Sequence, residues 1–98
     1  MNRDEIIAKL RETAPALKAE GVTKLAIFGS RARGDAREDS DLDVLIEVQE
    51  DERLSLLDLI DIQHIIQDAT GLQTQAELRS SITPRFASRI VDDLIEVF

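Results

Sequence analysis

One stretch constrains the fold of this chain more than any other: residues 24–48, which read KLAIFGSRARGDAREDSDLDVLIEV. An apolar run, LAIF, stops abruptly at Gly29, and a second apolar run, VLI, begins directly after Asp43. Short apolar runs bounded by turn-forming residues are typical of buried strands. The stretch therefore predicts a strand, a polar connection with a short helix, and a second strand.

Two aspartates open the second predicted strand. Side chains alternate faces along a strand that rises roughly 3.3 Å per residue, so Asp41 and Asp43 should point to the same side, about 6 to 7 Å apart at their backbones. Two Mg²⁺ ions about 4 Å apart can clamp the attacking and leaving oxygens of a phosphoryl group, and carboxylates are among their ligands. We therefore predict that Asp41 and Asp43 bind two divalent ions.

The other end of the connection has the features of a phosphate-binding turn. Gly29 allows an anion to approach the backbone, and Ser30 can cap the following turn, whose free N–H groups and dipole favour phosphate. Arg31 and Arg33 flank this turn, where each either contacts a triphosphate or is simply solvated; Arg37 is a weaker candidate. Gly29, Ser30, Arg31 and Arg33 are accordingly the predicted nucleotide-binding residues.

At this spacing the residues resemble the minimal nucleotidyltransferases of the DNA polymerase β-like superfamily. The signature of that family is Gly-Ser, ten residues, and then Asp-x-Asp. Here Gly29 and Ser30 are separated from Asp41 and Asp43 by residues 31–40. The resemblance implies an α+β fold of the polymerase β-like type, with a short mixed sheet flanked by helices, over nearly the whole chain.

The resemblance also implies an activity and a partner. Proteins of this kind are typically paired with a small helical HEPN-domain protein, often an RNase toxin, and can act as its antitoxin by transferring AMP from ATP to it with Mg²⁺. By this analogy Asp41 and Asp43 would be the catalytic, metal-holding residues, while Gly29 and Ser30 would hold the phosphates. The acceptor hydroxyl would belong to the partner protein.

One position departs from the family pattern. A third carboxylate normally follows from a motif similar to Gly-x-x-Val-Asp-Leu-Val, and laying the chain on that motif from Gly71 places Gln75 at the Asp position. An amide brings no charge and cannot act as a general base. Glu77, two residues on and on the same strand face, is a candidate replacement ligand. Two alternatives to protein AMP transfer stay open: a catalytically decayed binding module, and a transferase acting on a small hydroxylated molecule.

Length and charge limit the remaining function classes. With 98 residues the chain fits one domain, residues 1–98, and leaves no room for a separate acceptor-binding domain. We therefore expect another chain to provide the acceptor, in a homo- or hetero-oligomer. A net charge of −8 and the absence of Trp and Tyr argue against direct nucleic-acid binding and favour a basic protein partner.

The cysteine content and the hydropathy of the sequence indicate in which cellular compartment the protein functions. The chain has no cysteine, which excludes disulfides and thiolate metal sites. No apolar run approaches the roughly 20 residues that span a bilayer, and no signal-peptide core follows Met1. We expect a cytoplasmic protein that does not enter membranes.

Periodicity and capping residues predict the other elements. In the first half of the chain we expect a helix over 5–20 that is kinked between Arg11 and Pro15, strands at 24–28 and 42–48, and a short helix at 30–34. A charged loop at 49–53 should lead to a helix from 54 or 56 to 69, with a capping box formed by Ser55 and Asp58. We then expect a strand at 72–78, at the sheet edge or lining the site, and a last helix that is capped by Thr83 and has Pro84 as its first residue.

Two apolar groups on the predicted helices need an explanation. Phe86, Ile90, Leu94 and Val91 should form the buried stripe of the last helix. On the helix after residue 54, Leu56, Leu57, Leu59 and Ile60 exceed what one stripe requires, which predicts either an interface for another chain or a deeply buried helix. His64 lies between aspartates on the polar side of that helix, where a solvated or ion-paired imidazole is expected.

Overall fold

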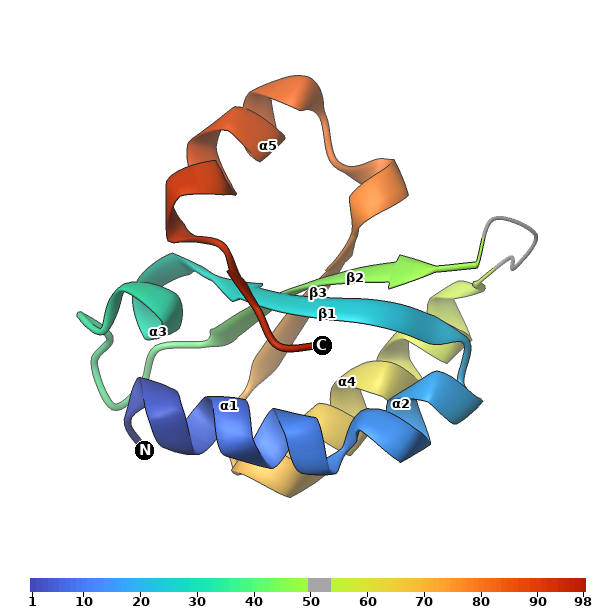
Figure 1. Cartoon of the computed structure of the whole chain (residues 1–98), viewed down its shortest axis with the longest axis horizontal. Coiled ribbons are helices and arrows are strands. Elements are labelled where there is room, and N and C mark those ends of the chain that lie inside the picture. Colours follow the sequence, from blue (N-terminus) through green and yellow to red (C-terminus); the bar gives the residue numbers. More distant parts are fainter. Residues whose placement is uncertain (50–53) are drawn as a thin grey trace.

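A computed structural model describes residues 1–49 and 54–98, so most of the predicted loop at 49–53 lies outside the described residues. No helix in these two ranges is long and apolar enough to cross a membrane. The elements, drawn in Figure 1, are α1 Arg3–Glu12, α2 Ala14–Ala19, β1 Val22–Phe28, α3 Gly29–Arg33, β2 Leu42–Val48, α4 Leu56–Thr70, β3 Thr74–Leu78, α5 Pro84–Ile90 and β4 Ile95–Glu96, with 3₁₀ turns at Arg79–Ser81 and Val91–Asp93.

The strands form one mixed sheet in the order β3-β2-β1-β4. β1 is antiparallel to both β2 and β4, whereas β2 and β3 are parallel and are connected through α4. This arrangement confirms the predicted α+β class with a short mixed sheet flanked by helices. It also puts the edge strand β3 next to β2, which carries Asp43 and begins directly after Asp41.

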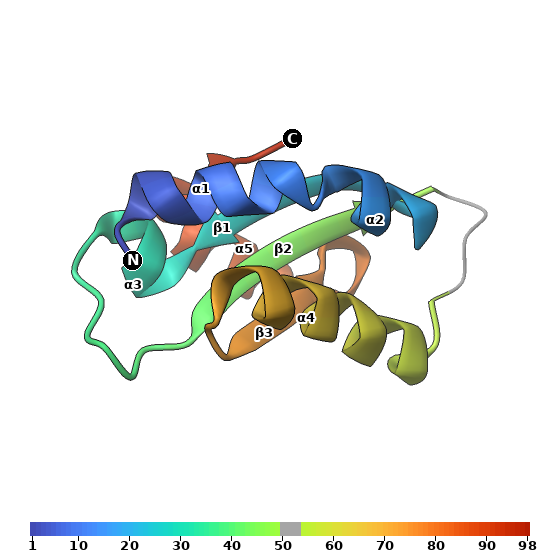
Figure 2. The ribbon, with the colours of Figure 1, turned by 90° about the horizontal axis from the view of Figure 1, so that it is seen from below.

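Helices cover both faces of the sheet. α1, α2 and α4 lie against one face and α5 lies across the other, as the two perpendicular views show (Figures 1 and 2). The larger core, on the three-helix side, consists of Ile6, Leu10, Leu17, Val22, Leu25, Ile27, Ala32, Leu42, Val44, Ile46, Ile62, Ile66, Ala76 and Val97. The smaller core, under α5, consists of Ala26, Phe28, Leu45 and Ile90. β2 is therefore covered on both faces past Asp43, with Val44 and Ile46 in the larger core and Leu45 in the smaller one.

Proline divides the predicted first helix into two. α1 ends at Glu12 and α2 begins at Ala14, with Pro15 in the first turn of α2, where a missing N–H costs little. The hydroxyl of Thr13 donates to the Leu10 carbonyl at 2.6 Å at the junction. The predicted kink is thus a full break between two separate helices.

Local capping chemistry sets the start of both later helices, as predicted. Ser55 and Asp58 form a reciprocal capping box at the start of α4. The Thr83 hydroxyl accepts from the Phe86 N–H at 3.1 Å, with Pro84 in the first turn of α5.

Three predictions about apolar residues and strands need correction. Val91 is 59% exposed because α5 gives way to a 3₁₀ turn there, which rotates its side chain out of the buried stripe. Leu56 and Leu57 are 73% and 72% exposed, so the deep-burial interpretation of the first turn of α4 is wrong for these two residues. Strand β4 was not predicted, because it has only two residues and depends on pairing with β1 far away in the sequence.

The outer edge of β3 is hydrogen-bonded by side chains of α4. The Thr74 N–H donates to Gln67 Oε1 at 3.2 Å, and the Ala76 N–H donates to Gln63 Oε1 at 3.0 Å. The two glutamines are four residues apart and therefore lie on the same face of α4. Strand donors that would otherwise face outward at a sheet edge are in this way satisfied within the chain.

We predict that Gln63→Met destabilises the protein by about 1 to 3 kcal/mol, because it preserves side-chain length but leaves the N–H of buried Ala76 without an acceptor. In a domain of this size each kcal/mol lowers the melting temperature by roughly 4 to 8 °C, which calorimetry resolves. Gln63→Glu, which retains acceptor oxygens, is the control. A Met variant as stable as the wild type would show that this hydrogen bond does not support β3.

Candidate active site

The two halves of the predicted site meet where β1 ends and β2 begins. The antiparallel register pairs Phe28 with Asp43, so the turn that follows β1 lies beside the aspartates that open β2. α3 starts at this point, at the left-hand end of the molecule in Figure 1. Pairing of the strands thus brings residues more than ten positions apart into one site.

Gly29 is required at this junction for two reasons. Its φ of +74° lies in the left-handed region, which residues with a Cβ rarely adopt. A Cβ added at Gly29 would also lie 2.6 Å from Oδ2 of Asp43, closer than side chains tolerate. The Asp43 carboxylate therefore lies directly against the backbone that starts α3, which brings the predicted phosphate-binding turn next to the predicted metal ligand.

Ser30 differs from its predicted capping role. It is the second residue of α3, because the helix already begins at Gly29, and the residue before the helix, Phe28, makes no side-chain capping bond. The Ser30 carbonyl instead accepts from the N–H groups of Gly34 at 2.9 Å and Asp35 at 3.1 Å. Its half-buried hydroxyl remains at the start of α3, beside Gly29.

Gln75 and Glu77 share a face of the sheet with Asp43. The parallel register pairs Asp43 with Gln75 and Leu45 with Glu77, and paired residues on adjacent strands project to the same side. Leu45 belongs to the core under α5, so this is the α5 side of the sheet. Both β3 side chains are exposed. The position that lacks a carboxylate is thus directly beside Asp43, as the family pattern would place it.

The pKa of Asp43 is raised above the usual value for an aspartate. Burial of its carboxylate is the largest cause, followed by the negative charges of Asp41 and Glu77, while Arg33 acts in the opposite direction. Asp43 is therefore exposed to the negative charge of two neighbouring carboxylates. Such mutual repulsion is what a bound cation relieves.

The donors at this site suit magnesium, although they are few. Within the described parts of the chain, no group of three or more His, Cys, Asp or Glu side chains is arranged to hold a metal ion. Glu77 is thus close enough to raise the pKa of Asp43 but does not form a three-carboxylate cluster with the two aspartates. One or two carboxylates completed by substrate phosphates are nevertheless a common magnesium environment, and Asp41 and Asp43 fit that description.

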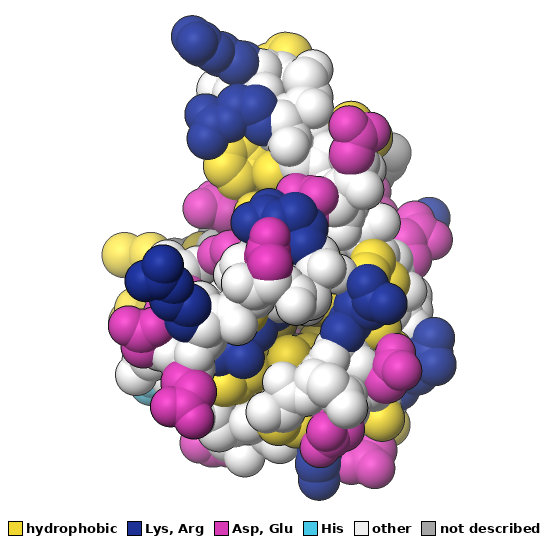
Figure 3. Space-filling view, turned by 90° about the vertical axis from the view of Figure 1, so that its left-hand side faces the viewer, with side chains coloured by type: hydrophobic (Ala, Val, Ile, Leu, Met, Phe, Trp, Pro, Cys, Tyr) yellow, Lys and Arg dark blue, Asp and Glu magenta, His cyan; other side chains and the backbone are white. Residues whose placement is uncertain are grey.

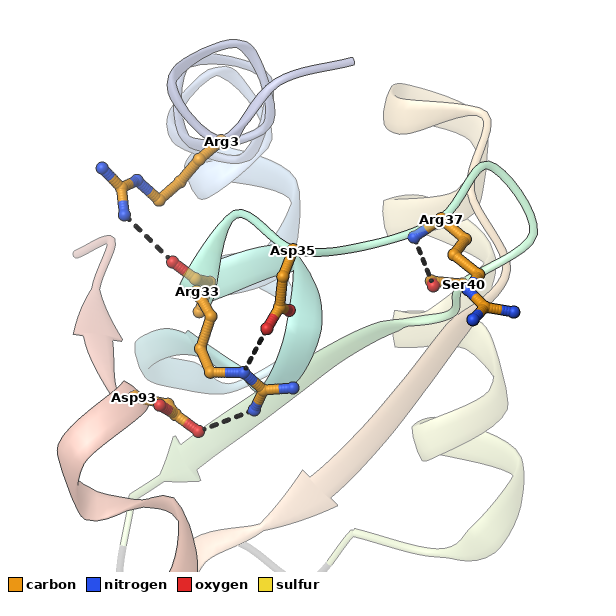
Figure 4. A network of polar contacts seen from close by, with 7 residues as sticks. Arg3, Arg33, Asp35, Arg37, Ser40 and Asp93 are labelled. Atoms are coloured by element: carbon orange, nitrogen blue, oxygen red, sulfur yellow. Dashed lines mark hydrogen bonds and ion pairs between the residues drawn. The ribbon is translucent and has the colours of Figure 1, made fainter.

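Arg33 joins α3 to the C-terminal part of the chain. Its guanidinium contacts Asp35 at 3.1 Å and Asp93 at 2.9 Å, a network drawn in Figure 4. Figure 3 looks onto this end of the molecule and shows basic and acidic side chains interspersed. Asp93 was not among the predicted site residues, because nothing local in the sequence links it to a residue 60 positions earlier.

Arg31 lies inside the protein. Its side chain is only 7% exposed and donates to the backbone carbonyls of Glu38 and Ser40. Arg37 is exposed, and its backbone N–H, rather than its guanidinium, contacts the Ser40 hydroxyl at 2.9 Å (Figure 4). Of the two predicted arginine contacts to a nucleotide, Arg33 is therefore the one with an exposed side chain.

Known proteins resemble this chain in sequence. The family model described as "Nucleotidyltransferase domain" matches residues 7–97. The Methanocaldococcus jannaschii protein named "Putative protein adenylyltransferase MJ0435" is 35% identical over 97 residues, which covers 99% of each chain. Protein adenylyltransferase MntA of Thermococcus cleftensis is 32% identical over 77 residues, covering 79% of this chain and 76% of that protein.

Solved structures have the same fold. One described as a "putative minimal nucleotidyltransferase" superimposes with a TM-score of 0.76 at 31% identity, covering 97% of this chain and 95% of the other. A chain from the structure of a tri-AMPylated Shewanella oneidensis HEPN toxin in complex with an MNT antitoxin gives a TM-score of 0.62 at 15% identity, covering 99% of this chain and 69% of that one, a likeness of fold alone.

The family match, the relatives and the mixed α+β fold together identify a nucleotidyltransferase. The chain belongs to the nucleotidyltransferase domain family, and within it to the minimal nucleotidyltransferases with a polymerase β-like fold. Its curated relatives carry the name of protein adenylyltransferases.

We predict that Asp43→Asn stabilises the metal-free protein at pH 7. Folding raises the pKa of Asp43, so the folded state is less favourable when this carboxylate is charged. The wild type therefore loses stability as the pH rises through the raised pKa, whereas the Asn variant does not lose this contribution. The gain from Asn should shrink as the pH falls and Asp43 becomes protonated. Urea unfolding in EDTA at several pH values measures this difference.

Asp68→Asn is the control for that measurement, because Asp68 is an exposed carboxylate on α4 and its replacement changes the net charge equally. If the two variants gain the same stability at every pH, burial and the neighbouring carboxylates do not perturb Asp43.

Proposed function

We propose that this protein transfers AMP from Mg-ATP to a hydroxyl group on a partner protein. The observation that carries the proposal is the contact between the two halves of the site, where the Gly29 backbone lies against the Asp43 carboxylate. A triphosphate on the turn would then have its metal ligands within reach. The relatives named as protein adenylyltransferases support AMP as the transferred group.

Each residue at the site has a role in this reaction. The Gly29 backbone and Ser30 would hold the phosphates, and Asp41 and Asp43 would hold two Mg²⁺ ions. The bound ions would neutralise charge on the phosphoryl oxygens. Arg33 would contact the triphosphate only by giving up one of its present carboxylate partners.

The chemistry replaces one bond with another. The acceptor oxygen forms a bond to the α-phosphorus of ATP while the bond from that phosphorus to pyrophosphate breaks, and the hydroxyl proton passes to a base. Gln75 cannot accept that proton, because an amide is not a base at neutral pH. Glu77 on the same strand face or solvent would take it.

The partner we propose is a HEPN-domain protein, which this chain would inactivate as an antitoxin. The structural likeness to a chain from the Shewanella oneidensis complex of an AMPylated HEPN toxin with an MNT antitoxin supports this assignment. Leu56 and Leu57, both more than 70% exposed at the start of α4, are candidate contact residues. Such a pair would act in the cytoplasm.

One observation favours a second candidate function. Gln75 lies beside Asp43, in the place where a third carboxylate would complete the metal site. If this loss has abolished catalysis, the chain would instead neutralise its partner by covering it. A small hydroxylated acceptor bound between two copies of the chain is the remaining alternative.

The decisive experiment incubates the purified chain with each labelled nucleoside triphosphate, Mg²⁺ and the protein encoded beside its gene, and then follows label on protein. We expect label from ATP alone. Label on a small molecule would favour the small-acceptor alternative, and a stable complex without label would favour the binding module.

We predict that Asp41→Asn combined with Asp43→Asn abolishes metal-dependent ATP binding while the fold survives, because the charge that holds the ions is removed. Calorimetry with Mg-ATP measures the affinity. The combination of Asp39→Asn and Asp68→Asn, two exposed carboxylates, is charge-matched and should bind normally. A folded Asp41/Asp43 variant with unchanged Mg-ATP affinity would refute the site assignment.

We also predict that Gln75→Asp increases the transfer rate by about tenfold or more, since positioned general-base catalysis is worth roughly 10² to 10⁴ in rate. If the wild type already uses Glu77, then Glu77→Gln should abolish transfer, and Gln75→Asp should change little. Initial rates of label transfer distinguish the two cases. If neither substitution changes a measurable rate, neither β3 residue takes part in catalysis.

A further inference from the structure

We propose that Arg31 is a positioning residue that holds the metal-binding aspartates in register with the phosphate-binding turn. This inference rests on the proposed metal site, and it assigns Arg31 a role other than contact with the nucleotide. Arg31 lies on α3, one residue after Ser30, and its side chain is directed to the loop that leads into β2.

The contacts of Arg31 are made with backbone carbonyls. Its Nη2 donates to the Glu38 carbonyl at 3.1 Å and to the Ser40 carbonyl at 2.9 Å, and its Nε donates to the same Ser40 carbonyl at 3.3 Å. The planar guanidinium thus holds two loop carbonyls in a fixed geometry. Among the described residues no carboxylate lies within salt-bridge distance of Arg31.

Burial makes this arrangement costly to disturb. Arg31 is 7% exposed, and a buried charge without partners is strongly unfavourable, so the carbonyl oxygens are needed to stabilise the guanidinium. The loop is correspondingly ordered around it: the Arg37 N–H donates to the Ser40 hydroxyl at 2.9 Å, and the Ser40 N–H donates to the Arg37 carbonyl at 3.0 Å.

The position of Ser40 gives these contacts their functional meaning. Its carbonyl belongs to the peptide group that joins it to Asp41, so fixing that carbonyl fixes the backbone from which the first aspartate projects. The next residue, Leu42, is held on the other side by its N–H donating to the Gln73 carbonyl at 2.8 Å. Asp41 is therefore held between Arg31 and β3.

One side chain in this way connects the two halves of the site. α3 carries the phosphate-binding turn at its start and Arg31 in its first turn, and Arg31 holds the loop that ends at Asp41. A shift of α3 would thus carry the aspartate with it. Groups that orient metal ligands commonly change metal affinity about 10- to 100-fold when removed.

The test measures Mn²⁺ binding by electron paramagnetic resonance without nucleotide, in Arg31→Gln, Arg31→Lys and wild type. We expect Mn²⁺ to bind about 10- to 100-fold more weakly to Arg31→Gln and with intermediate strength to Arg31→Lys, which retains the charge but not the planar fork. Charge alone predicts the opposite sign, since removing a cation near carboxylates strengthens cation binding.

Arg37→Gln is the matched control, because it removes the same charge from an exposed side chain of the same loop. It should bind Mn²⁺ at least as tightly as the wild type. ATP affinity in EDTA should be the same in Arg31→Gln and wild type, since the guanidinium does not reach the nucleotide. Mn²⁺ binding to Arg31→Gln that is unchanged or tighter would overturn the proposal, as would a loss of metal-free ATP binding.

Two further measurements keep the result decisive. If Arg31→Gln does not fold, the comparison is made with Arg31→Lys. If the wild type binds no Mn²⁺ without nucleotide, the two aspartates do not hold the ion without substrate phosphates, and amide hydrogen exchange then decides the role of Arg31. Exchange at Ser40 and Leu42 that is faster in the Arg31 variant than in Arg37→Gln supports positioning, and equal exchange overturns it.

Discussion

The contact between the Asp43 carboxylate and the backbone at Gly29 is the interaction on which the rest of the site depends. It requires a residue without a Cβ in a left-handed conformation, a strand register that pairs Phe28 with Asp43, and a helix that starts immediately after β1. The contact also costs free energy, because it partly buries a carboxylate beside Asp41 and Glu77. A substrate that brings cations would relieve that cost, so binding of Mg-ATP at this position would stabilise the fold.

The arginines close to this contact are already bound to other groups of the protein. Acidic side chains give a net charge of −8, yet the arginines near the site are committed to specific partners: Arg33 to two carboxylates and Arg31 to two carbonyls. The basic side chains of α3 thus act mainly within the protein. Neutralisation of a bound triphosphate would consequently depend on its metal ions more than on arginine, which is consistent with a small transferase that has few cationic contacts to spare.

Features that depend on local chemistry could be predicted from the sequence. Residues within one turn or strand determine the interruption of the first helix near Pro15, the capping box at Ser55, the start of α5 at Thr83 and the bounds of β2. Features that depend on tertiary contacts could not. The ion pair of Arg33 with Asp93 spans 60 positions, β4 exists only through its pairing with β1, and the burial of Arg31 becomes evident only once the loop folds back over α3. The same distinction explains Val91. The helical periodicity of the sequence indicated that this residue is buried, but the 3₁₀ turn exposes its side chain.

The glutamine contacts along β3 also limit how this protein can assemble. Extended peptides and misfolded chains commonly attach to a sheet by adding a strand to a free edge. On one edge of this sheet α4 occupies two of the donors that such a strand would need, and on the other edge β4 has only two residues. Growth of the sheet is therefore disfavoured on both sides. Helical surfaces and side chains are therefore better placed than the sheet edges to recognise another molecule, and the sheet serves as a support for the site.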